Sequence, residues 1–388
     1  MIVRSGRIWR QLILALLVIA IVESGAALIC RFLLAPLQAI RLIWNPDLEE
    51  ARKNWDALSS AADDEIGGYR VSDAKHNSEF PDEGQSCGSA YGDSYVGGAD
   101  VADDEGWVEQ LSHLLGCRVS NYAVGNYGTD QAFLRFRRIH DNSPIALLGV
   151  NPNTVMDNVS QYDGLLGSAL APTAMKGRFL LDSSDHLTWL PRPRLDRDGF
   201  VAMNRNPAET LPHSYFLPDT RDGPVTLGFP YTVTLARAAL MTRLRNILMR
   251  RAEWSSLYAA DHPSGALRLM AAICQAFAEL AKARGERPLL VILPIAHSFR
   301  ERANYGEFEY APLVAALQAK GLEVFDPGRA MIESLAGRSA CEFFVHQRPE
   351  TRLVSSPVPC GGHYSTVAHT TVAQLVAAEL RRRNFINR

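Results

Sequence analysis

The stretch SAYGDSYVGG, residues 89–98, decides how the rest of the chain is interpreted. A run of small residues leads into Gly-Asp-Ser, and glycines follow. This order predicts the end of a buried strand, a sharp turn, and a serine, Ser94, at the edge of a sheet. Backbone amides of such a turn can stabilise negative charge that develops beside the hydroxyl. Because Gly-Asp-Ser is also an ordinary turn sequence, the role of Ser94 depends on the other motifs of the chain.

The residues that follow alternate between strand and helix patterns. The predicted order is strand 85–91, helix 107–115, strand 117–124, helix 131–140 and strand 144–150. The last of these strands is continuously apolar, which is typical of a parallel strand covered on both faces. Strands that alternate with helices favour a doubly wound α/β fold.

This alternation is interrupted at about 165–263 and then returns. The interruption contains a predicted hairpin, 178–190, and a predicted basic amphipathic helix, 231–251. We treat it as an insertion that could cover the site or bind a partner. The elements predicted after it are helix 264–284, strand 288–294, a helix around Leu313–Leu317, strand 322–325 and a last helix that Ser365 or Thr366 begins. We therefore expect a three-layer α/β/α sandwich with a mostly parallel, five-stranded sheet.

The N-terminus carries an apolar run from Gln11 to Cys30, with arginines on both sides. A helix of this length is about 30 Å long, which matches the hydrocarbon core of a bilayer. A cleaved signal peptide is the alternative, but the apolar run continues to Leu34 and so favours an uncleaved anchor. Glu23 interrupts the run and is expected to be an acid tolerated near the interface. The expected organisation is an anchor at 1–37, a juxtamembrane spacer at 38–84 and a folded domain at 85–388 outside the cytoplasm.

Composition argues against several classes of function. The 388 residues carry a net charge of −2, so nothing indicates a nucleic-acid partner. The six cysteines have no zinc-site spacing, and we expect neither a metal nor a cofactor. In an oxidising compartment Cys341 and Cys360 could form a disulfide.

Four motifs follow the predicted strands in order. They are Gly92-Asp93-Ser94, the block 121–131, Gly149-Val150-Asn151, and the block 361–365 around His363. This order resembles the SGNH/GDSL hydrolase superfamily, whose blocks supply serine, glycine, asparagine and histidine. The resemblance covers most of 85–385 outside the insertion. The first two blocks, together with residues 176–179, also look like membrane-anchored SGNH proteins linked to cell-surface polysaccharide.

The resemblance implies a role for each block. Ser94 would be the nucleophile, and His363, in the loop before the last helix, would be the general base. The amides of Ser94 and of Gly125 or Asn126, with the side chain of Asn151, would form the oxyanion hole.

One feature departs from the family pattern. The family usually has an aspartate two or three residues before the histidine, where this chain has glycine and cysteine. Three alternatives follow: Ser94 and His363 act as a dyad, Asp326 or Glu342 reaches the histidine, or catalysis has been lost. Loss of the acid costs about four orders of magnitude in rate in one triad.

The sequence and the resemblance together imply a serine esterase or O-acyltransferase that acts on acyl esters of an extracytoplasmic glycan. The alternative is a catalytically inactive SGNH-like scaffold or glycan-binding protein in polysaccharide assembly. The expected location is the inner (plasma) membrane, with a single pass and the domain in the periplasm. The expected partners are the membrane, an acylated carbohydrate substrate and polysaccharide-assembly proteins.

Overall fold

The computed structural model describes residues 2–58, 66, 74–81, 86–166, 175–347 and 360–386. Parts of the expected spacer and residues 167–174 of the expected insertion lie outside them. The centre is a five-stranded sheet in the order β3–β2–β4–β8–β9, in which every neighbouring pair is parallel. The strands are β2 (Gly88–Tyr91), β3 (Val119–Asn121), β4 (Ile145–Val150), β8 (Arg287–Ile292) and β9 (Val324–Phe325). The predicted fold class, an α/β/α sandwich with a five-stranded parallel sheet, is confirmed.

The order of the strands places β2 at the point where the sheet reverses its direction of winding. The chain passes from β2 to β3 on one side and then to β4 on the other side. In open α/β sheets, ligand sites form outside the carboxyl ends of the strands at such a point. Ser94 begins the one-turn helix α3 (Ser94–Gly97) directly after β2, so it lies at this position.

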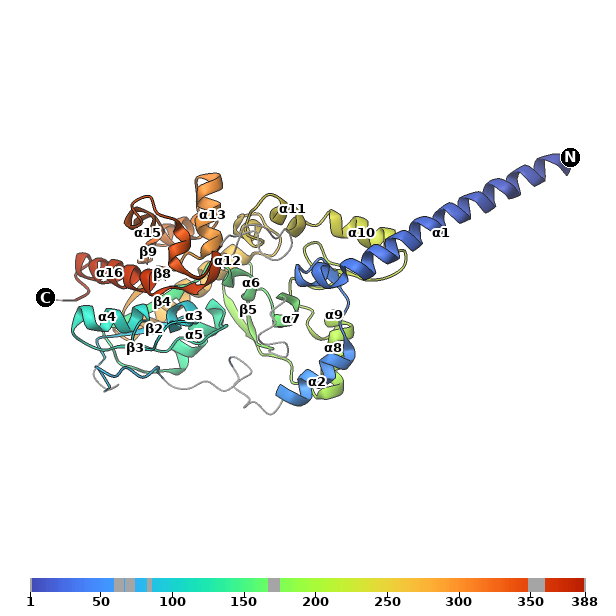
Figure 1. The fold of residues 1–388 in the computed structure, drawn as a ribbon. Coiled ribbons are helices and arrows are strands. Elements are labelled where there is room, and N and C mark those ends of the chain that lie inside the picture. The colour runs from blue at the N-terminus through green and yellow to red at the C-terminus, as the bar shows by residue number, and fades with distance from the viewer. Residues whose placement is uncertain are drawn as a thin grey trace.

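Helices cover both faces of the sheet (Figure 1). One face packs against α5 (Thr129–Arg138) and α12 (Ala266–Ala283), and the other against α4 (Trp107–Leu115) and α16 (Thr366–Arg382). Successive residues of β4 alternate between the two layers, because Leu147 belongs to the core on one face and Leu148 to the core on the other. The remaining helices after β8 are α13 (Ala296–Tyr305), α14 (Ala311–Ala319) and α15 (Gly328–Ser334).

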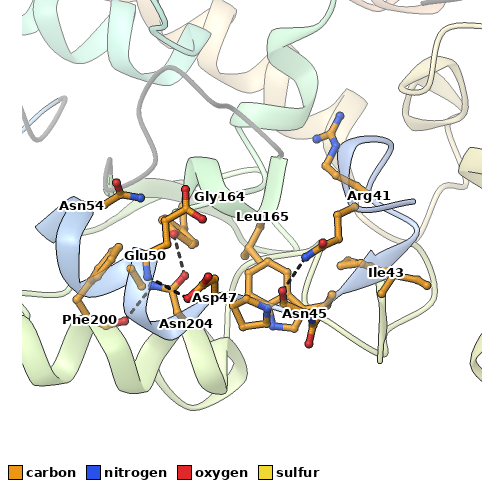
Figure 2. Close-up of a pocket in the computed structure, with 16 residues that line it drawn as sticks. Arg41, Ile43, Asn45, Asp47, Glu50, Asn54, Gly164, Leu165, Phe200 and Asn204 are labelled. Atoms are coloured by element: carbon orange, nitrogen blue, oxygen red, sulfur yellow. Dashed lines mark hydrogen bonds between the residues drawn. The ribbon is translucent and has the colours of Figure 1, made fainter. Parts of the chain in front are cut away.

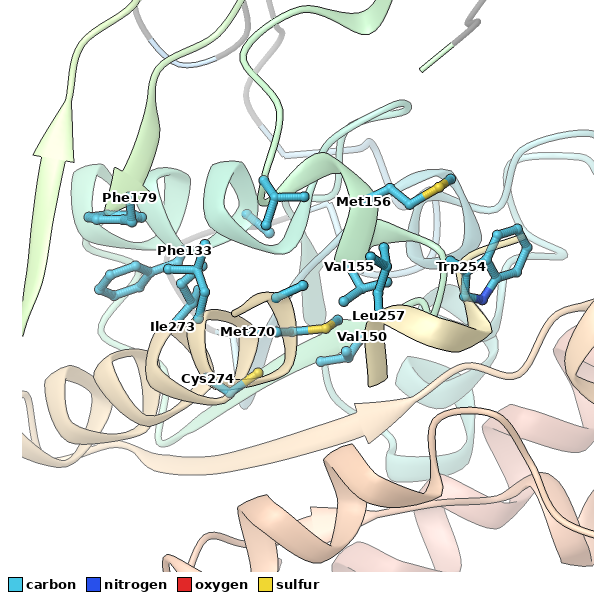
Figure 3. Packing of buried hydrophobic residues seen from close by; sticks show 14 of the residues in the cluster. Phe133, Val150, Val155, Met156, Phe179, Trp254, Leu257, Met270, Ile273 and Cys274 are labelled. Carbon is cyan, nitrogen blue, oxygen red and sulfur yellow. The ribbon is translucent and has the colours of Figure 1, made fainter. Parts of the chain in front are cut away.

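The helix α12 supplies much of the core on its face of the sheet. Its residues Met270, Ile273 and Cys274 are fully buried and lie close to Val150 of β4 and Val155 of the short helix α6 (Thr154–Asp157), as Figure 3 shows. Burying an aliphatic side chain of this size contributes about 1.5–3 kcal/mol. The core therefore holds the end of β4, and with it Asn151, at the same edge of the sheet as Ser94.

The region between β4 and α12 departs from the α/β alternation, and its first part is the predicted hairpin. The strands β5 (Arg178–Leu181) and β6 (Leu187–Leu190) pair antiparallel, with Arg178 opposite Leu190. The other elements are α7 (Asp163–Leu166), α8 (Arg197–Arg205), α9 (Pro207–Thr210), β7 (Val225–Thr226), α10 (Tyr231–Ala239), α11 (Thr242–Leu248) and the 3₁₀ turn η2 (Ser255–Tyr258). The single helix predicted at 231–251 is wrong, because Met241 has an extended backbone and separates α10 from α11.

The chain begins with a long helix, α1 (Ile2–Ala39), which projects from the folded body (Figure 1). Its residues Arg7–Gln38 are long and apolar enough to cross a membrane, by length and composition. After it, β1 (Ile43–Trp44) pairs with β7 of the insertion, and α2 (Leu48–Leu58) packs against α8. The segment after the apolar helix is therefore joined to the insertion.

Near the C-terminus, the loop predicted around His363 is in fact a strand. The strand β11 (Cys360–Tyr364) pairs antiparallel with β10 (Phe344–Gln347), apart from the main sheet. A disulfide joins Cys341 to Cys360 and so ties this ribbon to the segment before β10. The oxygen of the Ser365 side chain accepts from the backbone of Ala368 and caps α16. A second disulfide, between Cys87 and Cys117, was not predicted.

Candidate active site

The structure brings Ser94 and His363 into direct contact. The Oγ atom of Ser94 lies 2.9 Å from Nε2 of His363, although 269 residues separate them in the chain. Ser94 is held at the start of α3, where the Asp93 carboxylate caps the helix by accepting from the backbone N–H of Tyr95. His363 is presented by the β10–β11 ribbon. Two parts of the fold that are built independently therefore meet at this pair.

The acid beside the histidine is Asp100. Its Oδ2 atom lies 2.8 Å from Nδ1 of His363, on the side of the ring opposite Ser94. Asp100 follows α3 by a tight reversal in which Gly98 and Asp100 both have a φ of 66°. Aspartate tolerates this left-handed backbone better than most residues. The reversal brings a carboxylate from six residues after the serine to the ring that contacts the serine.

Asp326 and Glu342 are not the partners of His363, so the prediction of either as the orienting acid is corrected. Asp326 accepts from the Tyr310 hydroxyl at 3.0 Å and from the backbone N–H of Gly328 at 2.9 Å, at the start of α15. Glu342 accepts from Arg338 at 2.6 Å. The Nδ1 atom of the histidine faces Asp100 in the turn after α3 instead. A signal for Asp100 was present in the sequence, since Gly97-Gly98 permits a sharp reversal just before an acid.

A buried hydrogen bond connects the first motif to the third. The Asn151 amide donates from Nδ2 to Oδ2 of Asp93 at 2.8 Å, and both residues are buried. Burial raises the pKa of Asp93 to about 6, even though hydrogen bonds from Tyr95 and Asn151 act in the opposite direction. The neighbour of the serine thus has a structural role, in which it fixes both the serine turn and the asparagine. Because Nδ2 has two hydrogens, Asn151 keeps one donor besides the bond to Asp93.

The second motif approaches the serine through its glycine. A Cβ atom added to Gly125 would lie 3.9 Å from Cβ of Ser94, so the two backbones are close neighbours. The next residue, Asn126, has a φ of 66° and donates from its side chain to Asp163 at 2.9 Å. Gly125 is therefore the residue of this pair that we place beside the serine, while the Asn126 side chain is bonded to α7.

Aromatic side chains pack against the histidine. The Tyr95 hydroxyl donates to the carbonyl of Gly362 at 2.9 Å. The Tyr95 ring meets the rings of His363 and Tyr364 edge to face, with centroids 5.3 Å and 4.9 Å apart. These contacts hold β11 against α3, and they help to set the orientation of the imidazole.

A buried ion pair joins the second motif to the insertion. Lys176 donates to Asp130, and their side chains are 4% and 0% exposed. Nearby, Arg178 donates to the carbonyl of Val159 at 2.7 Å, and burial lowers the pKa of this guanidinium to about 10. The segment 176–179 is thus a seam between α5 and the insertion hairpin.

A cavity of about 240 Å³ lies elsewhere, between the segment after α1 and the insertion. Figure 2 shows Arg41, Asp47, Glu50 and Asn204 among the residues that line it. Neither Ser94 nor any of its contacts described above is part of this lining. Within the described ranges, no group of three or more His, Cys, Asp or Glu side chains is arranged to hold a metal ion.

Comparison with known proteins gives little beyond this geometry. No protein-family profile and no curated protein sequence matches the chain. One solved structure, a protein from Desulfitobacterium hafniense DCB-2 described as lipolytic and of the G-D-S-L family, is similar at a TM-score of 0.34 and 10% identity, over 75% of this chain and 97% of its own. Another crystal structure is similar at a TM-score of 0.34 and 15% identity, over 77% of this chain and 97% of its own. Similarity at this level does not bear on the function, which is therefore argued from the site.

Proposed function

We propose that this protein is a serine-dependent ester hydrolase or O-acyltransferase with Ser94, His363 and Asp100 as its catalytic triad. The observation that supports it is the continuous hydrogen-bonded series from Ser94 Oγ through both ring nitrogens of His363 to Asp100 Oδ2. This is the arrangement in which a base both accepts the nucleophile's proton and is oriented by an acid. A triad with Asp100 replaces both the dyad and the triads with Asp326 or Glu342 as the leading hypothesis.

In the proposed mechanism, Nδ1–H of His363 donates to Asp100, which leaves Nε2 free to accept the proton of Ser94. Ser94 Oγ attacks the ester carbonyl while its proton moves to Nε2. The imidazolium that forms is stabilised by the Asp100 carboxylate, and it then donates its proton to the leaving alcohol as the tetrahedral intermediate collapses. An acyl group remains on Ser94, and water or a sugar hydroxyl removes it by the same steps in reverse.

The negative charge of the tetrahedral intermediate requires donors near Ser94. We assign this role to the amides of Ser94 and Gly125 and to the second amide hydrogen of Asn151. The bond from Asn151 to Asp93 fixes the amide before the substrate arrives, so no reorganisation is needed during the reaction. Each such donor is worth about 3–4 kcal/mol of transition-state stabilisation.

The proposed substrate is an acyl ester of an extracytoplasmic glycan, and this part rests on the resemblance described above. The apolar helix α1 is compatible with attachment to the inner membrane and a periplasmic domain, where proteins of polysaccharide assembly would be partners. Whether water or a sugar takes the acyl group depends on the acceptor that reaches Ser94.

The proposal is tested with full-length protein in detergent. We expect a fluorophosphonate probe to label it covalently and p-nitrophenyl acetate to be hydrolysed, and we expect Ser94→Ala to abolish both. Ser183→Ala, which changes an exposed serine of the hairpin turn, is the matched control and should behave as wild type. Equal labelling of wild type and Ser94→Ala, or none of either, would overturn the proposal and favour the non-catalytic scaffold.

A further inference from the structure

The helix α10 and its flanking residues expose large apolar side chains. Phe229, Val233 and Leu240 are 76%, 50% and 86% exposed. An interval of seven residues places Val233 and Leu240 on one side of the helix, and Phe229 comes just before the helix begins at Tyr231. Arg237 lies between Val233 and Leu240 on this side; it is 46% exposed and its guanidinium contacts Asp219. Exposed large apolar side chains that are gathered at one place on a surface mark sites of interaction.

This surface lies beside the apolar helix α1. The two helices pack against each other at the end of α1 nearest the folded body, where Figure 1 shows α10 along the base of the long blue helix. In the same part of α1, Leu28 and Phe32 are 55% and 77% exposed. The exposed apolar side chains of α10 are thus added to those of a helix that is itself apolar enough to cross a membrane.

The contact between the two helices is made by Glu23. Its carboxylate accepts from the backbone N–H of Tyr231 at 2.7 Å, from the N–H of Thr232 at 3.4 Å, and from the Thr232 hydroxyl. The amides at the start of a helix have no partner within the helix, and an acid in an apolar span also needs donors. The Glu23 carboxylate and the first amides of α10 therefore provide each other with hydrogen-bond partners. Such internal partners are required where no water is available.

The position of Glu23 gives the depth of this contact. Arg31 is the next charged residue of α1 after Glu23, eight residues and so about 12 Å further along the helix axis toward the folded body. The start of α10 lies at the same level. Amphipathic helices that lie in a membrane interface bury their apolar side by about 5–10 Å.

We propose that α10 lies in the boundary between lipid headgroups and acyl chains of the leaflet next to the folded body, with Phe229, Val233 and Leu240 among the acyl chains. The proposal rests on α1 crossing the bilayer. The next helix, α11, and the turn after it also expose Leu248 and Met249, and Arg245 and Arg250 on either side of them are exposed as well. Exposed arginines beside an apolar patch suit the headgroups of anionic phospholipids. The occupant of this surface is therefore a phospholipid bilayer.

The test uses full-length protein in vesicles of phosphatidylcholine and phosphatidylglycerol. The free cysteines are removed by Cys30→Ala and Cys274→Ala, and Leu240→Cys carries an environment-sensitive fluorophore. We expect lipids with a nitroxide on the acyl chain to reduce its emission by about twofold or more, as for a side chain in the acyl boundary. Leu114→Cys, on an exposed site of α4, is the control that should not be quenched.

Three results would overturn the proposal. Quenching of the position 240 label by aqueous iodide to the same degree as the label at position 114 would show that α10 faces water. Protection from both quenchers would show that a protein covers α10. A third label, at Ile19→Cys in the exposed middle of α1, should be quenched by the lipid nitroxide. If it were not quenched, α1 would not cross the bilayer, and the proposal would lose its basis. None of these measurements depends on esterase activity, so they are independent of the proposed reaction.

The role of Glu23 has its own test. We expect Glu23→Ala to lower the lipid quenching of the label at position 240 by about twofold while the label at position 19 is unaffected, because the start of α10 loses its acceptor. Glu23→Gln keeps an acceptor oxygen and should retain most of the quenching. If Glu23→Ala leaves both labels unchanged, Glu23 does not hold α10 in the membrane.

Discussion

Two of the ionic contacts that aspartates make in the described residues differ in their surroundings. Asp100 contacts His363 at the active-site edge, where their side chains are 44% and 29% exposed. Asp130 contacts Lys176 in the seam with the insertion, where the exposed fractions are 0% and 4%. An exposed pair contributes little to stability, whereas removal of one partner from a buried pair leaves an uncompensated charge. The first contact is therefore expected to matter for orientation and rate, and the second for folding.

The largest expected effect is on the rate, at Asp100. Asp100→Asn should lower kcat by about 10⁴-fold, because an amide cannot hold the reactive tautomer of His363 or stabilise the imidazolium. Its free energy of unfolding should change by less than about 1 kcal/mol. Steady-state hydrolysis and urea titration measure the two quantities. Asp103→Asn changes a nearby acid that is 88% exposed and should affect neither. A wild-type kcat in Asp100→Asn would show that the pair Ser94–His363 acts alone.

At the seam, substitution of Lys176 should lower stability rather than the rate of the reaction. Lys176→Met leaves Asp130 buried without its partner and should lower the free energy of unfolding by about 3–5 kcal/mol. The fraction that remains folded should still be labelled by a fluorophosphonate. Urea titration measures the loss of stability. Lys320→Met, which changes an exposed lysine at the C-terminal end of α14, is the control. If Lys176→Met unfolded at the same urea concentration as wild type, the buried pair would contribute no more to stability than the exposed pair Asp100–His363.

The two disulfides allow a second comparison between the active-site edge and the rest of the fold. They close loops of similar length, but only Cys341–Cys360 lies next to the ribbon that carries His363. Each should contribute about 3–4 kcal/mol by restricting the unfolded chain, since the sequence separations are 30 and 19 residues. Loss of Cys341–Cys360 should also lower activity, because this bond holds the ribbon that carries His363. Loss of Cys87–Cys117, at the opposite ends of the strands, should lower stability alone. Paired Cys→Ala variants, assayed for both quantities, test this, and equal activity in the two would contradict it.

The smallest expected effect is that of a second histidine, which is fully buried. Nδ1 of His369 accepts from the backbone N–H of Trp107 at 3.1 Å, and burial lowers the pKa of its ring to about 4. Below pH 6.5 the unfolded chain binds a proton that the folded protein does not bind until about pH 4. Stability should therefore fall by up to about 3 kcal/mol as the pH drops through this window. His369→Gln should flatten that part of the pH profile, measured by thermal unfolding, and an unchanged profile would assign the loss to other groups.

Regular elements were the most predictable part of this chain. The strand predicted at 144–150 is β4 (Ile145–Val150), and Gly116 ends α4 with a φ of 69°. Both were predictable because burial and backbone sterics act locally there. The break between α10 and α11 was missed, since it occurs at Met241 without glycine or proline. There the packing of α10 on α1, which is remote in sequence, outweighs helix propensity.

The candidate site was predictable only in part, for the same reason. Ser94 and His363 were identified from the order of the motifs, and the structure brings them together. Asp100 was missed, because its contact depends on a left-handed turn and on a ribbon that is 263 residues away in the sequence. The ribbon itself was missed, since β11 is short and rich in glycine. Neither the contact with Asp100 nor the β10–β11 ribbon can be predicted from the residues next to His363 alone.

The separation of 269 residues between Ser94 and His363 has a consequence for the protein during its synthesis. Ribosomes add roughly 5–20 residues per second, so the base follows the nucleophile by roughly 13–54 s. A nascent chain that already contains the serine turn still lacks the histidine, its ribbon and the Cys341–Cys360 bond. In the proposed mechanism, Ser94 therefore has no general base until translation is nearly complete.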